Sequence, residues 1–160
     1  MKRIVKIVSG GQTGADRAGL DAAVEAGILH GGWCPRGRFA EDGKIPAKYR
    51  LKQTMSSFYT ERTEKNVLDS DMTAVFTFGP PLGGSASTVI YAKRHGKPFR
   101  HFDLNGKESV LVKDFCKWLE SLEKDEIVLN IAGSRESTGP GAYEKVKNIL
   151  AETLAEFHQL

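Results

Sequence analysis

The chain has 160 residues, of which 40% are hydrophobic and 27% are charged, an ordinary composition for one soluble globular domain with its own core. The formal net charge of +3 argues against a dedicated nucleic-acid-binding surface, and no apolar run is long enough to span a membrane. The N-terminus shows no secretory signal pattern, so we expect a cytoplasmic protein. Cys34 and Cys116 have no metal-ligand spacing, and a disulfide between them is not expected in a reducing compartment.

The first strand and the turn after it are the most informative segment. An apolar, β-branched run from Ile4 to Val8 stops at paired glycines, and a helix-compatible run from Ala15 to Ala26 begins at once. Such a turn aims backbone N–H groups at one point and adds the positive end of the helix dipole, so phosphates bind there. The alternative is a plain turn whose glycines only permit tight packing. The predicted anion-binding residues of this turn are Ser9, Gly10, Gly11, Gln12, Thr13 and Gly14.

This turn departs from the two familiar nucleotide-binding loops. A P-loop needs a Lys-Ser or Lys-Thr pair after its last glycine, where this chain has Ala15-Asp16. The dinucleotide fingerprint needs a glycine where Ser9 stands, and an acidic residue about twenty positions later, where residues 33–38 are basic. The turn is therefore not expected to be an ordinary NAD or ATP site.

Strand and helix patterns alternate along the rest of the chain. Leu29 to Cys34 is predicted as a strand, and the long polar loop from Pro35 to Pro46 is of a kind that is often functional. The remaining predictions are a short strand within 51–59, a helix over 60–70 with Thr60 as its N-cap, a strand over 72–78, a helix over 85–95, a strand over 99–103, a helix over 108–122, a strand over 127–132 and a helix from Gly139 to the C-terminus. The alternation predicts one α/β domain over residues 1–160, a Rossmann-like three-layer sandwich with a mostly parallel sheet.

Three strands of the predicted sheet end in similar chemistry. Residues 9–14, 79–85 and 133–139 are each rich in glycine and hydroxyl side chains, and each segment leads from a strand into a helix. In a parallel sheet these exits share one edge, where ligands bind near a topological switch point. The sequence therefore predicts a site for a phosphate-rich or oxyanion ligand at this edge. The residues that the two later exits contribute are Gly83, Gly84, Ser85, Ser134, Arg135 and Glu136.

Several charged and polar side chains have more than one interpretation. Asp16 lies in a first helical turn, where it suits the dipole but would repel a phosphate, so it is a cap, a Mg²⁺ ligand or an acceptor for a ligand N–H or O–H. Arg62 and Asn66 share a helix face, where they either bind phosphate and a heterocycle edge or form a solvated surface. Arg38 either faces the ligand or belongs to a solvated loop. Arg135 either faces the anion or pairs with the neighbouring Glu136.

Blocks of sequence that cover most of the chain resemble the family called putative molybdenum carriers. This family is a circularly permuted branch of the SLOG or LOG-like Rossmann superfamily, which includes DNA-processing protein A and the lysine-decarboxylase-like cytokinin-activating enzymes. The resemblance implies binding of molybdenum cofactor, a pterin with a phosphate, or of a nucleotide, and it implies a homo-oligomer. The matching blocks are residues 10–17, 31–38, 40–43, 59–63, 66–67, 70–71, 83–85 and 132–137.

Some branches of the superfamily are phosphoribohydrolases with a Pro-Gly-Gly-x-Gly-Thr-x-x-Glu signature. The comparable stretch here, residues 81–90, has no Glu, which argues against that hydrolysis. We therefore expect a non-catalytic carrier or sensor for a phosphorylated heterocycle, as a homodimer or homotetramer without nucleic-acid or membrane partners. One alternative is a nucleotide or nucleoside-phosphate hydrolase that uses Asp16, Glu41, Asp42 or Glu136 as acid or base. Another is a protein-binding module with a vestigial pocket.

Overall fold

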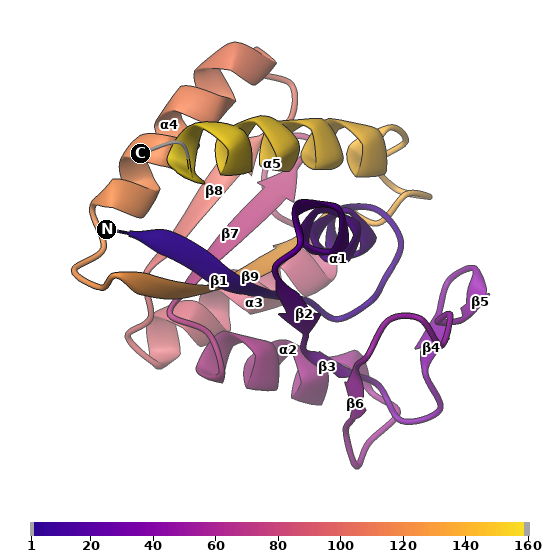
Figure 1. Ribbon diagram of the computed structural model, residues 1–160. Helices are drawn as coiled ribbons and strands as arrows, with labels where there is room; N and C mark the ends of the chain where they lie inside the picture. The colour runs from indigo at the N-terminus through magenta and orange to yellow at the C-terminus, as the bar shows by residue number, and fades with distance from the viewer. Residues whose placement is uncertain (1, 159–160) are drawn as a thin grey trace.

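A five-stranded parallel sheet forms the centre of the computed structural model, which describes residues 2–158 (Figure 1). The predicted α/β class with a parallel sheet is thus confirmed. The strands of this sheet are β1 (Arg3–Val8), β2 (Leu29–Gly31), β7 (Met72–Thr77), β8 (Phe99–Asp103) and β9 (Glu126–Gly133). The helices are α1 (Ala15–Ala26), α2 (Tyr59–Leu68), α3 (Gly83–Arg94), α4 (Glu108–Glu120) and α5 (Ala142–His158).

The order of the strands determines which loops meet. The sheet runs β2-β1-β9-β7-β8, so the last strand of the chain lies between the first strand and β7. All four neighbouring pairs are parallel. The carboxyl ends of β1, β9 and β7 are therefore consecutive along one edge of the sheet.

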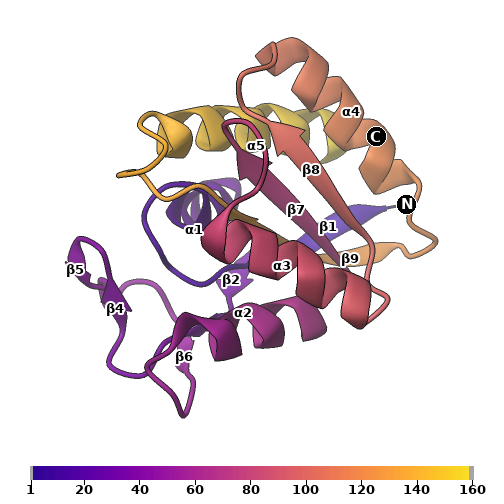
Figure 2. The ribbon, with the colours of Figure 1, turned by 180° about the vertical axis from the view of Figure 1, so that it is seen from behind.

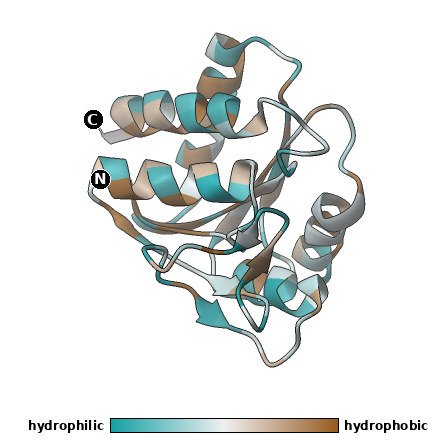
Figure 3. Cartoon of the chain, turned by 90° about the vertical axis from the view of Figure 1, so that its right-hand side faces the viewer, coloured by the Kyte–Doolittle hydropathy of each residue, from teal (hydrophilic) through white to brown (hydrophobic). Residues whose placement is uncertain are grey.

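Two layers of helices cover the sheet. Helices α1, α4 and α5 lie on one face, and α2 and α3 lie on the other (Figures 1 and 2). Hydrophobic and hydrophilic residues alternate around the helices, as expected for elements with one buried side (Figure 3). None of the helices within residues 2–158 combines the length and the apolar composition that a membrane crossing requires.

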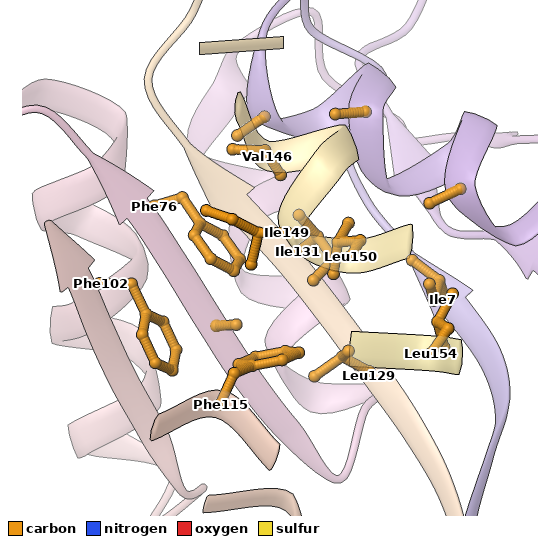
Figure 4. Packing of buried hydrophobic residues seen from close by; sticks show 14 of the residues in the cluster. Ile7, Phe76, Phe102, Phe115, Leu129, Ile131, Val146, Ile149, Leu150 and Leu154 are labelled. Carbon is orange, nitrogen blue, oxygen red and sulfur yellow. The ribbon is translucent and has the colours of Figure 1, made fainter. Parts of the chain in front are cut away.

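The two faces of the sheet differ in chemistry. Alternate residues of a strand point to opposite faces. On β7, Met72, Ala74 and Phe76 belong to the main hydrophobic core with residues of α4 and α5 (Figure 4). The residues between and after them, Thr73, Val75 and Thr77, are buried on the other face, and two of the three are polar. The side of the sheet under α2 and α3 is therefore the polar one.

The predicted second strand, Leu29 to Cys34, is two separate strands. Gly32 interrupts it with a φ of +122°, and a Cβ there would lie 2.3 Å from the carbonyl oxygen of Ser9. After this break, β3 (Trp33–Cys34) pairs with β6 (Lys52–Gln53) in a small sheet of its own. The predicted loop contains a hairpin of β4 (Phe39–Ala40) and β5 (Gly43–Lys44). We call residues 33–53 the arm.

The predicted N-cap of α2 is wrong. The helix begins at Tyr59, so Thr60 lies inside it, and the residue before the helix is Phe58 without a side-chain cap. The carboxylate of Glu61 accepts hydrogen bonds from the amides of Met55 at 3.2 Å and Ser56 at 3.1 Å. These bonds fix the turn that precedes the helix, so the helix starts one residue earlier than its composition suggests.

Three phenylalanines form the centre of the apolar face (Figure 4). The ring of Phe76 lies 5.1 Å from that of Phe102 and 5.7 Å from that of Phe115. We expect Phe76→Ala to lower the free energy of unfolding by about 3–5 kcal/mol, because it removes buried apolar area and leaves a cavity. Urea denaturation measures this loss. Phe58→Ala is the control, since Phe58 is 76% exposed, and a comparable loss there would contradict the packing.

Candidate functional site

A cleft of about 370 Å³ opens where β1, β9 and β7 end, between the sheet and the helices α2 and α3. All three predicted strand exits contribute to its wall. Ten of the predicted site residues line it, and they are Gly10, Gln12, Asp16, Arg62, Asn66, Gly83, Gly84, Ser85, Ser134 and Arg135. The other lining residues include Thr77, Thr88 and Asn130, which the sequence did not single out.

The start of α3 presents free backbone donors to the cleft. The amides of Ser85 and Ala86 bond to the carbonyl of Leu82, at 3.1 and 3.4 Å. Within residues 2–158, the amides of Gly83 and Gly84 donate to no protein acceptor. A Cβ added to either glycine would meet nothing within 4 Å, so their backbone is open to an approaching group. Free amides at the positive end of a helix dipole form an anion site.

Three amides of the loop after β1 bond to side chains near them in sequence, whereas the amide of Gly10, which lines the cleft, has no protein acceptor within residues 2–158. The amide of Gly11 donates to Ser9 Oγ at 3.4 Å and that of Gln12 to Asp16 Oδ2 at 3.2 Å. The amide of Thr13 donates to Gln12 Oε1 at 3.1 Å. Three of the N–H groups that the sequence predicts for phosphate are therefore already satisfied inside the protein. This loop is held as a scaffold beside the cleft.

A buried ion pair forms one wall of the cleft. Arg62 Nη1 lies 3.2 Å from Asp16 Oδ2, and the two side chains are 10% and 11% exposed. A Cβ on Gly10 would lie 1.7 Å from Arg62 Nη1, so the guanidinium packs directly on the glycine backbone. Burial raises the pKa of the Asp16 carboxyl above its usual value, and the Arg62 charge opposes this rise. Arg62 also stacks over the Tyr59 ring at 5.0 Å.

Two buried polar atoms of the cleft wall lack partners. Gln12 Nε2 and Arg62 Nε are buried donors without an acceptor among residues 2–158. Asn130, which also lines the cleft, donates from Nδ2 to Thr73 Oγ1 at 3.2 Å. Unsatisfied buried groups are rare in folded proteins and call for an explanation. Because these atoms lie at a cleft, hydrogen bonds to a bound ligand are an explanation that fits.

The floor of the cleft is polar because it belongs to the polar face of the sheet. Thr77 Oγ1 donates to the carbonyl of Gly79 at 2.7 Å and contacts His101 Nε2 at 2.6 Å. Thr88 Oγ1 donates to the carbonyl of Gly84 at 3.0 Å. Sequence reasoning missed these residues and Asn130. For Thr77 and Asn130 the available signal was a polar residue within an otherwise apolar strand, whereas Thr88 lies on α3.

The exit of β9 contributes an arginine without a carboxylate partner. Arg135 lines the cleft, and its guanidinium lies 5.7 Å from the centre of the Tyr59 ring. Within residues 2–158 it forms no ion pair. The considered pairing with Glu136 is absent, because Glu136 accepts the amides of Gly141 at 2.8 Å and Tyr143 at 3.0 Å instead. The Arg135 charge therefore stays available to a ligand.

The remaining predicted site residues lie outside the cleft lining. Ser9 Oγ donates to the carbonyl of Asp16 at 2.8 Å and braces the first loop. Gly11 faces Leu51 and Ile45, and Gly14 packs against the backbone of Ser134. These residues, like Thr13 and Glu136, lie outside the lining and pack behind it.

Two side chains that were predicted to contact the ligand, Arg38 and Asn66, form hydrogen bonds to the arm instead. Arg38 donates to the carbonyls of Pro46 and Tyr49, both at 2.9 Å, and so closes the arm on itself. The Asn66 amide accepts from Trp33 N at 2.8 Å and donates to Trp33 O at 3.0 Å. Asn66 lines the cleft, but most of its hydrogen-bonding capacity serves the strand β3.

Three of the four carboxylates considered for hydrolysis are used elsewhere. Glu41 binds Thr13 and Ser137, and although burial raises its pKa, these hydrogen bonds lower it below the usual value. Asp42 pairs with Arg17 at 2.6 Å, which lowers its pKa. Only Asp16 lines the cleft. In the described part of the chain, no group of three or more His, Cys, Asp or Glu side chains is placed to hold a metal ion.

Comparisons with known proteins agree with the resemblance seen in the sequence. The profile of the circularly permutated YpsA SLOG family matches residues 7–154. The crystal structure of the putative molybdenum carrier protein from Syntrophus aciditrophicus SB is similar, with a TM-score of 0.91 and 43% sequence identity over 96% of each chain. A search among curated proteins finds no match. The chain belongs to the circularly permuted YpsA SLOG family.

Proposed function

We propose that this protein is a carrier or sensor that binds a phosphorylated heterocycle in the cleft. The observation that carries the proposal is the open start of α3, where two glycine amides have no protein acceptor. The Arg135 guanidinium lines the same cleft and forms no direct ion pair within residues 2–158, although its charge is felt by Asp16 and Glu41. A phosphate there gains amide donors, a helix dipole and a cation together.

The position of the phosphate follows from which amides are free. The sequence predicts two glycine-rich loops as phosphate binders, one before α1 and one before α3. The amides of Gly11, Gln12 and Thr13 are used internally, so we place the phosphate at Gly83 and Gly84. Ser134, also in the lining, supplies a hydroxyl on the opposite wall.

The rest of the ligand occupies the polar part of the cleft. Asn130 Oδ1 and the Asp16 carboxylate offer acceptors, and Gln12 Nε2 offers a donor. Donors and acceptors in one slot suit the edge of a purine or a pterin ring, whose amide-like groups carry both. The molybdenum carrier name of the similar crystal structure is consistent with a pterin phosphate as cargo, and a nucleotide fits the same chemistry.

One observation favours a hydrolase as a second candidate. Asp16 is a buried carboxylate in a cleft, and its raised pKa is typical of a general acid or base. Against this role, its Oδ2 already binds Arg62 and the amide of Gln12. The binding role and the catalytic role predict different behaviour of one variant, which is described below.

Arg135 tests the position of the anion. We expect Arg135→Met to weaken binding of the best ligand among AMP, GMP and IMP by about ten- to a hundredfold, because a charge-assisted contact is lost. Calorimetry measures the affinity. Arg94→Met is the matched control, since it removes the same charge from an exposed position at the end of α3. Equal losses in both variants, or no nucleotide binding by the wild type, would contradict the proposal.

Asp16 separates a binding protein from an enzyme. In a binding protein, Asp16→Asn weakens nucleotide affinity by about ten- to a hundredfold through a lost charge-assisted acceptor, and no product forms with either variant. In a hydrolase, the same change leaves affinity nearly intact and lowers the rate by about 10²–10⁴. Affinity by calorimetry and product by chromatography are measured on the same preparations, after circular dichroism shows that the variant is folded. A turnover that collapses while affinity holds would replace the carrier proposal.

The quaternary structure stays a prediction. Several large apolar side chains are exposed, including Met55, Phe58 and Leu82, and the sheet ends in the edge strands β2 and β8. These features support the homodimer or homotetramer expected from the family resemblance. Light scattering on the purified chain of 17.6 kDa distinguishes these states from a monomer.

A further inference from the structure

A second, smaller cavity lies on the polar side of the sheet, beside β1, β2 and the beginning of the arm. Its volume is about 160 Å³. At about 30 Å³ for each water molecule, it has room for roughly five waters, or for a small ion with part of its hydration shell. Its lining residues are Lys6, Val8, His30, Gly31, Gly32, Trp33, Arg50, Lys52, Asp69 and Val128.

Lys6 is the unusual residue of this cavity. It stands in the middle of the apolar strand Ile4 to Val8, on the face opposite the core, and is half-buried. Its ammonium crosses Gly31 so closely that a Cβ there would lie 3.3 Å from Nζ. Among the described residues, no carboxylate pairs with it. A half-buried lysine beside a cavity, with no paired carboxylate, favours an anion there.

The other charges around the cavity add to that of Lys6. Arg50 and Lys52 are exposed side chains of the arm and form no ion pair within residues 2–158. Asp69 is the single acidic residue of the lining, and its Oδ2 accepts Trp33 Nε1 at 2.7 Å. Three lysine and arginine charges therefore face one carboxylate that is already hydrogen-bonded. Such a one-signed concave surface concentrates anions.

The Trp33 ring is held rigidly among these cations. The ammonium of Lys65 lies 4.3 Å from the ring centre, and that of Lys52 lies 5.4 Å from it. The Asn66 side chain fixes the Trp33 backbone through both N and O. Four basic side chains, from β1, α2 and the arm, thus converge on a preformed wall.

We propose that this cavity binds a small tetrahedral oxyanion such as phosphate or sulfate, separately from the main cleft. Lys6 is the central contact, and Arg50 and Lys52 close the anion from the side of the arm. The site shares no lining residue with the main cleft. The proposal therefore does not rest on the function proposed for that cleft.

The Trp33 indole N–H reports on the site directly. Sodium sulfate is titrated into ¹⁵N-labelled protein, with sodium chloride at matched ionic strength as the reference, because general screening acts equally in both salts. We expect a saturating shift of the Trp33 indole signal with sulfate alone. The Trp118 indole is the internal control, since it packs on the core face near Phe102 and Phe115. Its signal should stay in place.

Variants assign the effect to Lys6. We expect Lys6→Met to weaken the sulfate response of Trp33 by about ten- to a hundredfold, while Lys113→Met, an exposed lysine of α4, leaves it unchanged. If Lys6→Met does not fold, Lys52→Met, at an exposed position of the arm, replaces it. We expect this variant also to weaken the sulfate response of Trp33. Titration with inorganic phosphate and with ribose 5-phosphate distinguishes a free ion from an ester. A linear, non-saturating shift, or equal affinity in the Lys6, Lys52 and Lys113 variants, would overturn the proposal.

Discussion

A buried ion pair between Asp16 and Arg62 ties together the elements that make the cleft. Asp16 belongs to α1 on one face of the sheet, and Arg62 belongs to α2 on the other. Their contact crosses the end of β1, where only a glycine leaves room for the guanidinium. Removal of one partner from such a pair costs about 3–5 kcal/mol, because the other charge stays buried alone. The pair therefore fixes the distance between the helix layers at the site.

The same carboxylate also satisfies one amide of the loop before α1. Asp16 Oδ2 accepts the amide of Gln12, and this bond helps to close the loop before α1. No acidic residue stands in the first turn of α3, and its leading glycines carry no side chain. In the first loop the amides of Gly11, Gln12 and Thr13 are thus satisfied from within, whereas those of Gly83 and Gly84 remain open. The two loops are alike in composition, and they differ in how many of their amides the protein already satisfies.

The unequal faces of the sheet explain why the cleft is polar inside. The core of Phe76, Phe102 and Phe115 supplies the hydrophobic stabilisation on one face. Because that face supplies this stabilisation, the other face can include the polar residues Thr77 and Asn130, which contribute less apolar packing. A polar slot behind an anion site is what a phosphorylated ring requires, and a protein with two apolar faces could not offer it.

Local patterns were enough to predict the fold and the edge at which the cleft lies. Strand and helix periods, glycine turns and the parallel alternation depend on neighbours in sequence, and these predictions agree with the structure. Contacts between distant residues could not be predicted. The Asn66 bonds to Trp33 and the closure of the arm by Arg38 join residues that no local pattern connects. The break at Gly32 likewise depends on the carbonyl of Ser9.

The most direct test of the account follows backbone amide signals by ¹H-¹⁵N NMR during titration with AMP and GMP. A phosphate at the start of α3 predicts large, saturating shifts of the Gly83 and Gly84 amides. The amides of Gly11, Gln12 and Thr13 should move little, since they already donate to Ser9, Asp16 and Gln12. Larger saturating shifts in the loop before α1, with Gly83 and Gly84 unmoved, would contradict the account.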